Sequence, residues 1–218
     1  MINLIRHQDF FNPLEIQEEI HVVGTGAVGS HIATFLARLG VESLHLWDFD
    51  TVGDHNIPNQ MFREIDIGKL KTIALKEQLE EINSDIEVIL HGKYNNEELT
   101  GYVFACVDNI EIRKELYESN EYNARLKAVF DTRIGLDEGQ VFSAQWDNDI
   151  HRDNLIAATQ FSHDEVKEET TACGSKLAIL PTVVLVSNIA VTNFINLLKT
   201  NSMKHIITFN SFNLSISR

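Results

Sequence analysis

The feature that most constrains the fold is a glycine loop that follows a short apolar segment. Residues 20–23 are apolar apart from one histidine and run directly into the letters GTGAVGS, after which apolar residues recur at helical spacing up to Gly40. In such a loop Gly24 permits a tight turn, Gly26 lets a ligand approach the backbone, and Gly29 lets the helix pack on the strand. Free N–H groups at the start of the helix attract an anion. We therefore predict a strand–turn–helix unit that binds the phosphates of a nucleotide.

Acidic residues end the second apolar segment. This segment, residues 42–48, closes with Asp48, and Asp50 follows two positions later. An acidic residue about 20 positions beyond a glycine loop is placed to accept hydrogen bonds from ribose hydroxyls. The alternative is that Asp48 only caps a turn, but its spacing from the loop favours the ribose interpretation. Both Asp48 and Asp50 are candidate nucleotide-binding residues.

The rest of the chain alternates between apolar segments and helical patterns. Strands are predicted over residues 20–23, 42–48, 86–90, 102–107 and 128–131, with two further helices over 69–82 and 110–126. This alternation predicts an α/β fold with a Rossmann-like, mostly parallel sheet flanked by helices. Antiparallel C-terminal strands are predicted over 140–146, 206–209 and 214–217, while the polar residues 147–171 show no clear period. Because no linker or repeat is visible, we expect residues 1–218 to form a single domain.

Composition limits the partners and the compartment. The 18 basic and 32 acidic residues give a formal net charge of −14, which argues against nucleic acid or an anionic membrane as a partner. Residues 177–198 are uncharged and long enough to span a bilayer, but their asparagines and hydroxyl residues favour a buried helix. The chain has two cysteines and no basic-then-apolar leader, so we expect a reduced, cytoplasmic setting.

Three polar clusters would meet the glycine loop at the carboxyl edge of such a sheet, where open α/β sheets bind ligands. The loop 54–60 offers the amides of Asn56, Asn59 and Gln60 to phosphate oxygens. Lys71 places an ammonium at the start of a helix, although it could equally be an ordinary solvated residue. Asp108 follows a buried strand, where it could ligate magnesium beside a nucleotide, cap the next helix, or do both.

The order and wording of these motifs resemble the ubiquitin-activating superfamily in its compact bacterial form, the ThiF/MoeB/HesA adenylyltransferases. The resemblance covers nearly the whole chain, and its most specific phrases are DFDTV at 48–52 and CVDN at 106–109. It implies that a homodimer uses ATP and Mg²⁺ to adenylate the C-terminal carboxylate of a small ubiquitin-like or sulfur-carrier protein, releasing pyrophosphate. In some members a thioester or a sulfur transfer follows.

The resemblance also implies individual roles. Asp48 resembles the ribose-binding acid, and Asn56 and Gln60 resemble triphosphate contacts. Lys71 is similar to the lysine that neutralises charge on the phosphates, and Asp108 to the aspartate that holds magnesium. The remaining counterpart is Arg6, which resembles an N-terminal arginine that the family lends across its dimer.

Two cysteines differ in their expected roles. Cys173 precedes the long apolar helix and resembles a cysteine that accepts the activated protein in some relatives. A thiol at a helix N-terminus has a lowered pKa, which makes the thiolate more available. The alternative is that Cys173 is a small residue that packs at a helix start. Cys106 lies in a buried apolar segment and is predicted to be part of the core.

The chain departs from the family at two points. Asn59 stands where the family carries an arginine, in the pattern N-x-x-R-Q, and an asparagine brings no charge to a transition state. Arg63 or Arg6 would then have to substitute. The zinc-binding cysteine pairs of many relatives are also absent from the sequence.

Two other classes of function stay open. A non-catalytic nucleotide-binding or partner-binding module would keep the fold and lack the loop arginine. An NAD-dependent oxidoreductase would bind NAD(H) and give no role to Lys71 or Asp108. A related branch that adenylates a tRNA base is disfavoured by the charge of −14.

Overall fold

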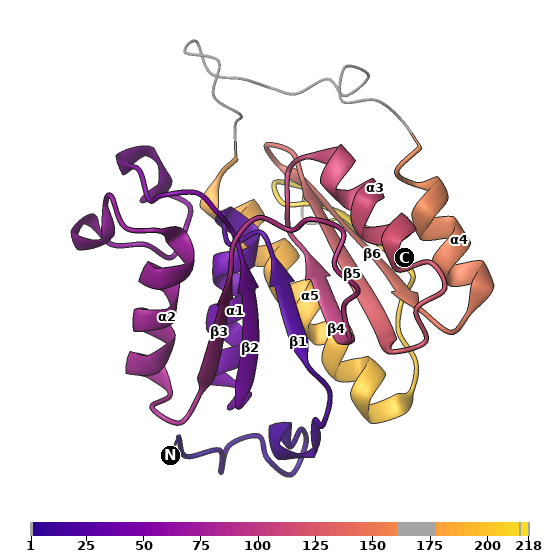
Figure 1. Ribbon diagram of the computed structural model, residues 1–218, viewed down its shortest axis with the longest axis horizontal. Helices are drawn as coiled ribbons and strands as arrows, with labels where there is room; N and C mark the ends of the chain where they lie inside the picture. Colours follow the sequence, from indigo (N-terminus) through magenta and orange to yellow (C-terminus); the bar gives the residue numbers. More distant parts are fainter. Residues whose placement is uncertain (1, 161–177, 214, 218) are drawn as a thin grey trace.

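A computed structural model describes residues 2–160, 178–213 and 215–217 and has one eight-stranded sheet in the order β3-β2-β1-β4-β5-β6-β7-β8. Figure 1 shows the sheet flanked by helices on both faces. The strands are β1 (Ile20–Val23), β2 (Ser43–Trp47), β3 (Glu87–His91), β4 (Gly101–Ala105), β5 (Leu126–Ile134), β6 (Glu138–Gln145), β7 (Ile206–Asn210) and β8 (Ser215–Ser217). The helices are α1 (Ala27–Arg38), α2 (Lys71–Ile82), α3 (Ile110–Ser119), α4 (Asp149–Ala157) and α5 (Leu180–Thr200).

The sheet has a parallel half and an antiparallel half. Strands β1 to β5 pair in parallel, whereas β6, β7 and β8 pair antiparallel to their neighbours. This arrangement confirms the predicted fold class. Between β1 and β4 the connections change direction, because the chain first builds outward through β2 and β3 and then returns to the other side of β1. Ligands bind at such a switch point in open α/β sheets.

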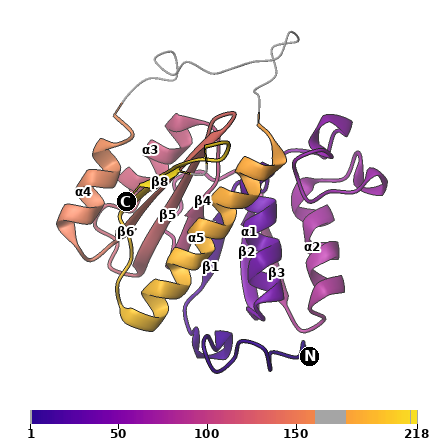
Figure 2. The same cartoon turned by 180° about the vertical axis from the view of Figure 1, so that it is seen from behind.

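Two hydrophobic cores lie on opposite faces of the sheet. On one face α1 and α5 pack against each other, and α5 also crosses β5 and β6 (Figure 2). This core also includes apolar side chains of α2, among them Leu75 and Leu79. On the other face α3 and α4 cover β4 to β6, with Leu116, Tyr117 and Trp146 in the core. The cores hold the carboxyl ends of β1, β2, β4 and β5 together at one edge.

The helix α5 is long and apolar enough to cross a membrane, by length and composition alone. Half of its most apolar window is nevertheless buried in the protein, against α1, β5 and β6. Its polar side chains Thr182, Ser187 and Asn193 are buried with hydrogen-bond partners. These contacts are those of a core helix, which is what its composition predicts.

Two elements differ from the sequence-based expectation. The helix α3 ends at Ser119 rather than near residue 126, because the buried Asn120 side chain accepts a hydrogen bond from the Leu99 N–H and donates to the Leu116 carbonyl. A helix, α4, also forms within the polar stretch that was expected to be irregular. Its only fully buried residue is Leu155, so the sequence has little apolar periodicity to reveal it.

Candidate functional site

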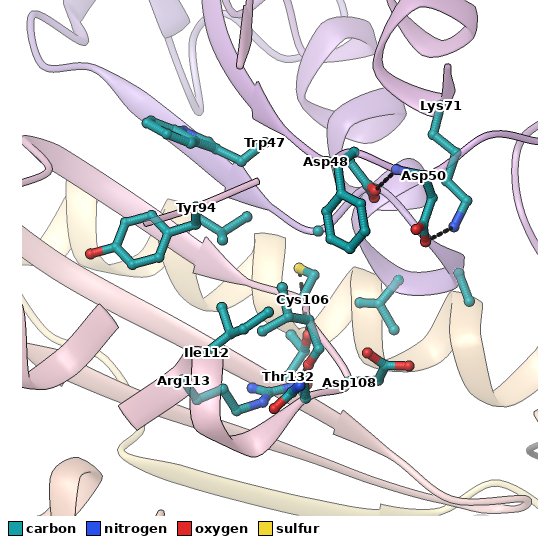
Figure 3. Close-up of a pocket in the computed structure, with 18 of the residues that line it drawn as sticks. Trp47, Asp48, Asp50, Lys71, Tyr94, Cys106, Asp108, Ile112, Arg113 and Thr132 are labelled. Carbon is teal, nitrogen blue, oxygen red and sulfur yellow. Dashed lines mark hydrogen bonds and ion pairs between the residues drawn. The ribbon is translucent and has the colours of Figure 1, made fainter. Parts of the chain in front are cut away.

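A cavity of about 560 Å³ opens at the carboxyl ends of β1, β2, β4 and β5. That size suits a nucleotide-sized ligand. Figure 3 shows its walls, with Asp48, Asp50 and Lys71 on one side and Asp108, Arg113 and Thr132 across from them. Of the predicted site residues, seven line the cavity: Gly24, Gly26, Asp48, Asp50, Gln60, Lys71 and Asp108.

The glycine loop turns sharply out of β1 into α1. Gly24 has a φ of +90°, and its N–H donates to the Trp47 carbonyl at 2.8 Å. A Cβ on Gly29 would lie 1.8 Å from the Gly24 carbonyl oxygen, so this position closes the turn and has no room for a side chain. A Cβ on Gly26 would meet no atom within 4 Å. The space over Gly26 is open to the cavity, as a loop that takes a ligand against its backbone requires.

The Asp48 carboxylate is anchored to the glycine loop. Its Oδ2 accepts hydrogen bonds from the Thr25 N–H at 2.8 Å and the Thr25 hydroxyl at 2.9 Å. Its Oδ1 accepts one from the Asp50 N–H at 2.9 Å. Asp48 therefore does cap a turn, and it does so while facing the cavity. Since each carboxylate oxygen can accept two hydrogen bonds, Oδ2 is fully used by Thr25, whereas Oδ1 keeps capacity for a ligand hydroxyl.

Lys71 and Asp50 form an ion pair in the cavity wall. The Lys71 Nζ lies 2.8 Å from Asp50 Oδ2, with the lysine side chain 9% exposed. The neighbouring Lys69 instead pairs with Asp66 and Glu77 and does not line the cavity. The two lysines therefore have different surroundings, and Lys71 is not an ordinary solvent-exposed residue of the helix.

Asp108 lies between β4 and α3 and is exposed at the cavity. In the part of the chain that the structure describes, its carboxylate has no hydrogen bond or ion pair. The adjacent Asn109 is the N-cap of α3, and its side chain accepts a hydrogen bond from the Glu111 N–H at 2.8 Å. The capping role considered for Asp108 therefore belongs to Asn109, and the Asp108 oxygens are available to a ligand.

The loop after β2 turns only one of its three amides into the cavity. Gln60 lines it, and its Oε1 is buried without a hydrogen-bond partner among the described residues. Asn56 is buried in a short 3-10 turn, where its side chain accepts a hydrogen bond from the Gly53 N–H. Asn59 donates to the Ala178 carbonyl at 3.1 Å. Asn56 and Asn59 thus hold the loop rather than face the cavity.

The arginines considered as substitutes for a loop arginine lie elsewhere. Arg63 is paired with the buried Asp66 and with Glu81 and does not line the cavity. Arg6 is exposed in the N-terminal segment, which packs near the end of α1. Figure 1 shows the N-terminus below the strands, at the end of the sheet where β1 begins. The cavity lies at the other end, where β1 leads into the glycine loop. The contribution of Arg6 to the site of a partner subunit stays a prediction.

The structure describes one of the two cysteines, Cys106. Cys106 is the first residue after β4 rather than part of the strand. It is partly buried and packs against the core, and it also lines the cavity. Burial raises the pKa of its thiol to about 11, so the thiol is protonated near neutral pH. Cys173 lies outside the described residues.

Several cavity residues escaped the sequence-based prediction. Trp47, Tyr94 and Ile112 form a wall with an apolar and aromatic surface, and burial raises the pKa of the Tyr94 hydroxyl. Arg113 and Arg133 also line the cavity, and both are paired with the fully buried Asp131. The signal for these arginines was modest: Arg113 lies one helical turn after the cap Asn109, and Arg133 follows two residues after Asp131 near the end of β5.

The chemical groups that line the cavity suit a nucleoside triphosphate with a divalent cation. It combines an open glycine backbone, an anchored acid, an ammonium and an aromatic wall. Among the described residues, no group of three or more histidine, cysteine, aspartate or glutamate side chains could hold a metal alone. A single carboxylate such as Asp108 suits Mg²⁺, which is usually bound by one or two carboxylates together with substrate phosphates and water.

Sequence comparison identifies relatives at about 30% identity. Ubiquitin-like modifier-activating enzyme 5 of Dictyostelium discoideum is 32% identical over 118 residues, covering 45% of this chain and 31% of the relative. A molybdopterin-synthase adenylyltransferase of Salmonella typhimurium is 28% identical over 147 residues, covering 63% of this chain and 58% of the relative. The chain spans less than two thirds of the length of either relative.

Solved structures share the architecture. The crystal structure of E. coli MccB with ATP superposes with a TM-score of 0.67 at 18% identity, covering 92% of this chain and 63% of that chain. PaaA superposes with a TM-score of 0.68 at 16% identity, with the same coverage of both chains. At these identities the likeness establishes the fold alone. The ThiF family model, however, matches residues 8–217, so the chain belongs to the ThiF family.

Proposed function

We propose that this protein uses ATP and Mg²⁺ to adenylate the C-terminal carboxylate of a small ubiquitin-like or sulfur-carrier protein. One observation carries the proposal: the glycine loop, Asp48, the Lys71–Asp50 pair and Asp108 line one cavity. The MccB structure with ATP and the adenylyltransferase relatives support it, since they share the fold or the family.

Each side chain has a role in this proposal. The backbone at Gly26 and the start of α1 would hold phosphate oxygens, and Asp48 would accept hydrogen bonds from the ribose. Lys71 would neutralise charge on the phosphates, helped by the Gln60 amide. Asp108 would hold Mg²⁺, which supplies charge stabilisation at the phosphates. The base would lie against Trp47, Tyr94 and Ile112.

The reaction needs positioning and charge stabilisation more than acid–base groups. An oxygen of the carrier carboxylate attacks the α-phosphorus of ATP and forms a new P–O bond. The bond from this phosphorus to the bridging oxygen breaks, and pyrophosphate leaves with the electron pair. The carrier is left as an acyl adenylate. No proton has to be removed from the attacking carboxylate, because it is already ionised at neutral pH.

ATP–pyrophosphate exchange with a candidate carrier protein tests the proposal. We expect exchange that depends on the carrier and on Mg²⁺ and that is lost in Asp108→Asn. Asp54→Asn is the matched control, because Asp54 is exposed and lies outside the cavity. NAD(H) binding without ATP binding would contradict the proposal and support the oxidoreductase alternative.

The second candidate function is a nucleotide-binding module without adenylation activity. The orientation of Asn59 favours it, because this side chain donates to the Ala178 carbonyl and brings no cation to the cavity. ATP binding with no exchange, for any carrier encoded beside the gene, would support the module.

The homodimer is part of the proposal and has its own test. Light scattering on the purified protein should give twice the chain mass of 24.7 kDa. If Arg6 is lent to a partner subunit, Arg6→Ala should lower exchange while the mass stays that of a dimer.

A further inference from the structure

A buried ionic cluster lies beneath the segment that carries Asp108. It consists of Arg113 on α3 and Asp131 and Arg133 on β5. The side chains of Arg113 and Asp131 are 6% and 0% exposed. Arg133 lies 2.7 Å from the second carboxylate oxygen of Asp131, and it also donates to the Ala158 carbonyl at 2.9 Å. One carboxylate thus serves two guanidinium groups.

Arg113 also donates three hydrogen bonds to backbone carbonyls at the strand ends. Its Nη1 donates to the Ala105 carbonyl at 3.3 Å, and its Nη2 donates to the carbonyls of Thr132, at 2.8 Å, and of Val107. The planar guanidinium presents these donors in a fixed geometry. It therefore ties the end of β4 and the segment after it to the end of β5.

The contact with Val107 bears directly on Asp108. The carbonyl of Val107 and the N–H of Asp108 belong to one planar peptide group, so holding the carbonyl fixes the plane from which Asp108 extends. On the other side, Asn109 is fixed as the cap of α3. Asp108 is exposed between these two fixed points.

We propose that Arg113 is a positioning residue, which holds the peptide group before Asp108 so that the Asp108 carboxylate meets Mg²⁺ bound with the nucleotide. This inference rests on the proposed function. Asp131 supplies the negative charge that lets Arg113 stay ionised in a buried position, and Arg133 anchors Asp131 from its other oxygen.

The test is ATP binding measured by calorimetry, first in EDTA and then across a Mg²⁺ titration. In Arg113→Lys we expect ATP affinity in EDTA within about twofold of wild type. Mg²⁺ should raise the ATP affinity of both proteins, but the variant should need a Mg²⁺ concentration about tenfold higher or more to reach half of this gain (the Mg²⁺ midpoint). Losing a group that orients a metal ligand commonly weakens metal binding by such a factor. Asp108→Asn should abolish the Mg²⁺-dependent gain.

Arg152→Gln is the matched control. Arg152 is also nearly buried, is paired with Asp149 and Asp153, and donates to the Trp146 carbonyl, but it lies outside the cavity. A purely structural role for Arg113 would lower Tm in both variants and leave both Mg²⁺ midpoints at the wild-type value. If Arg113→Lys does not fold, the double variant Arg113→Gln/Asp131→Asn keeps the net charge of the cluster and takes its place.

The outcomes separate the two proposals. Wild-type protein without Mg²⁺-dependent ATP binding would overturn the proposed function itself. Wild-type protein that binds ATP with Mg²⁺, together with unchanged midpoints in the Arg113 variants, would overturn only the positioning role. A raised midpoint in the Arg113 variants and an unchanged one in Arg152→Gln supports it.

Discussion

The ion pair between Lys71 and Asp50 joins the first turn of α2 to the segment after β2. The Nζ–Oδ2 distance is 2.8 Å, and the Lys71 N–H also donates to the Asp50 carbonyl at 2.9 Å. The lysine is held by both its backbone and its side chain, whereas the Asp50 carboxylate is half exposed. An anionic ligand in the cavity would find this ammonium already desolvated and fixed.

We expect Lys71→Ala to weaken ATP binding by about tenfold or more, because hydrogen bonds to charged groups contribute about 1.5–3 kcal/mol. Titration calorimetry with ATP measures the change. Lys69→Ala removes a similar charge outside the cavity and should leave ATP affinity within about twofold of wild type. Equal losses in the two variants would indicate a general effect of net charge.

The glycine loop offers a pair of substitutions that separate folding from binding. Gly29→Ala places a methyl group 1.8 Å from the Gly24 carbonyl oxygen, so Tm should fall clearly, by the equivalent of about 1–3 kcal/mol or more. Gly26→Ala meets no protein atom within 4 Å and should lower Tm less. Its methyl group would occupy the space over the loop, and ATP affinity should fall. Thermal unfolding and calorimetry on both variants check these expectations.

The sequence predicted the parallel half of the sheet well, because the strand residues there are mostly apolar and the glycine loop marks the first crossover. It failed where tertiary contacts decide the structure. The side chain of Asn120 ends α3 through contacts with Leu99 and Tyr94, which are distant in sequence. The helix α4 packs on β6 with little apolar periodicity of its own.

The stability of the protein should depend on pH through His21. Burial, with a smaller contribution from His45, lowers the pKa of His21 from 6.5 to about 4. The folded protein therefore keeps His21 neutral between these values, while the unfolded chain binds a proton. The contribution of the neutral His21 to the free energy of unfolding is therefore fully present above pH 6.5 and is lost as the pH falls toward 4.

At pH 5 this difference amounts to roughly 2 kcal/mol of unfolding free energy. Urea unfolding at pH 7 and pH 5 measures it, and His21→Gln should reduce the pH dependence. His45 and His91 have pKa values lowered by burial and contribute with the same sign. His55→Gln is the control, because the His55 side chain is 78% exposed.

If the proposed adenylation continues to a thioester, the thiol of Cys173 should carry it. Cys106 is a poor nucleophile because burial raises its pKa to about 11. We expect a carrier adduct, formed with ATP and Mg²⁺ and cleaved by dithiothreitol, that persists in Cys106→Ala and disappears in Cys173→Ser. Intact-mass spectrometry detects the adduct. An adduct that survives in Cys173→Ser would assign it to another residue.

The candidate site was only partly predictable for a related reason. Asp48, Lys71 and Asp108 end or begin regular elements, so their spacing in the sequence places them at the edge of the sheet. The orientation of Asn59 toward the Ala178 carbonyl depends on a contact between residues 119 positions apart. The arginines of the ionic cluster were missed because their pairing with Asp131, the last residue of the predicted strand 128–131, is a tertiary contact that leaves no pattern in the sequence.

The position of β1 between β2 and β4 has a consequence for how the protein folds. The first part of the chain supplies the glycine loop, Asp48 and Lys71, and the part after β3 supplies Asp108, so neither part contains a complete cavity. Pairing of β4 with β1 is the step that assembles it. A partly folded chain in which only β1 to β3 have paired would gain little from a nucleotide, whereas the native chain gains the full binding free energy. Nucleotide present during refolding would therefore act after this pairing, by slowing unfolding rather than by speeding the first association of strands.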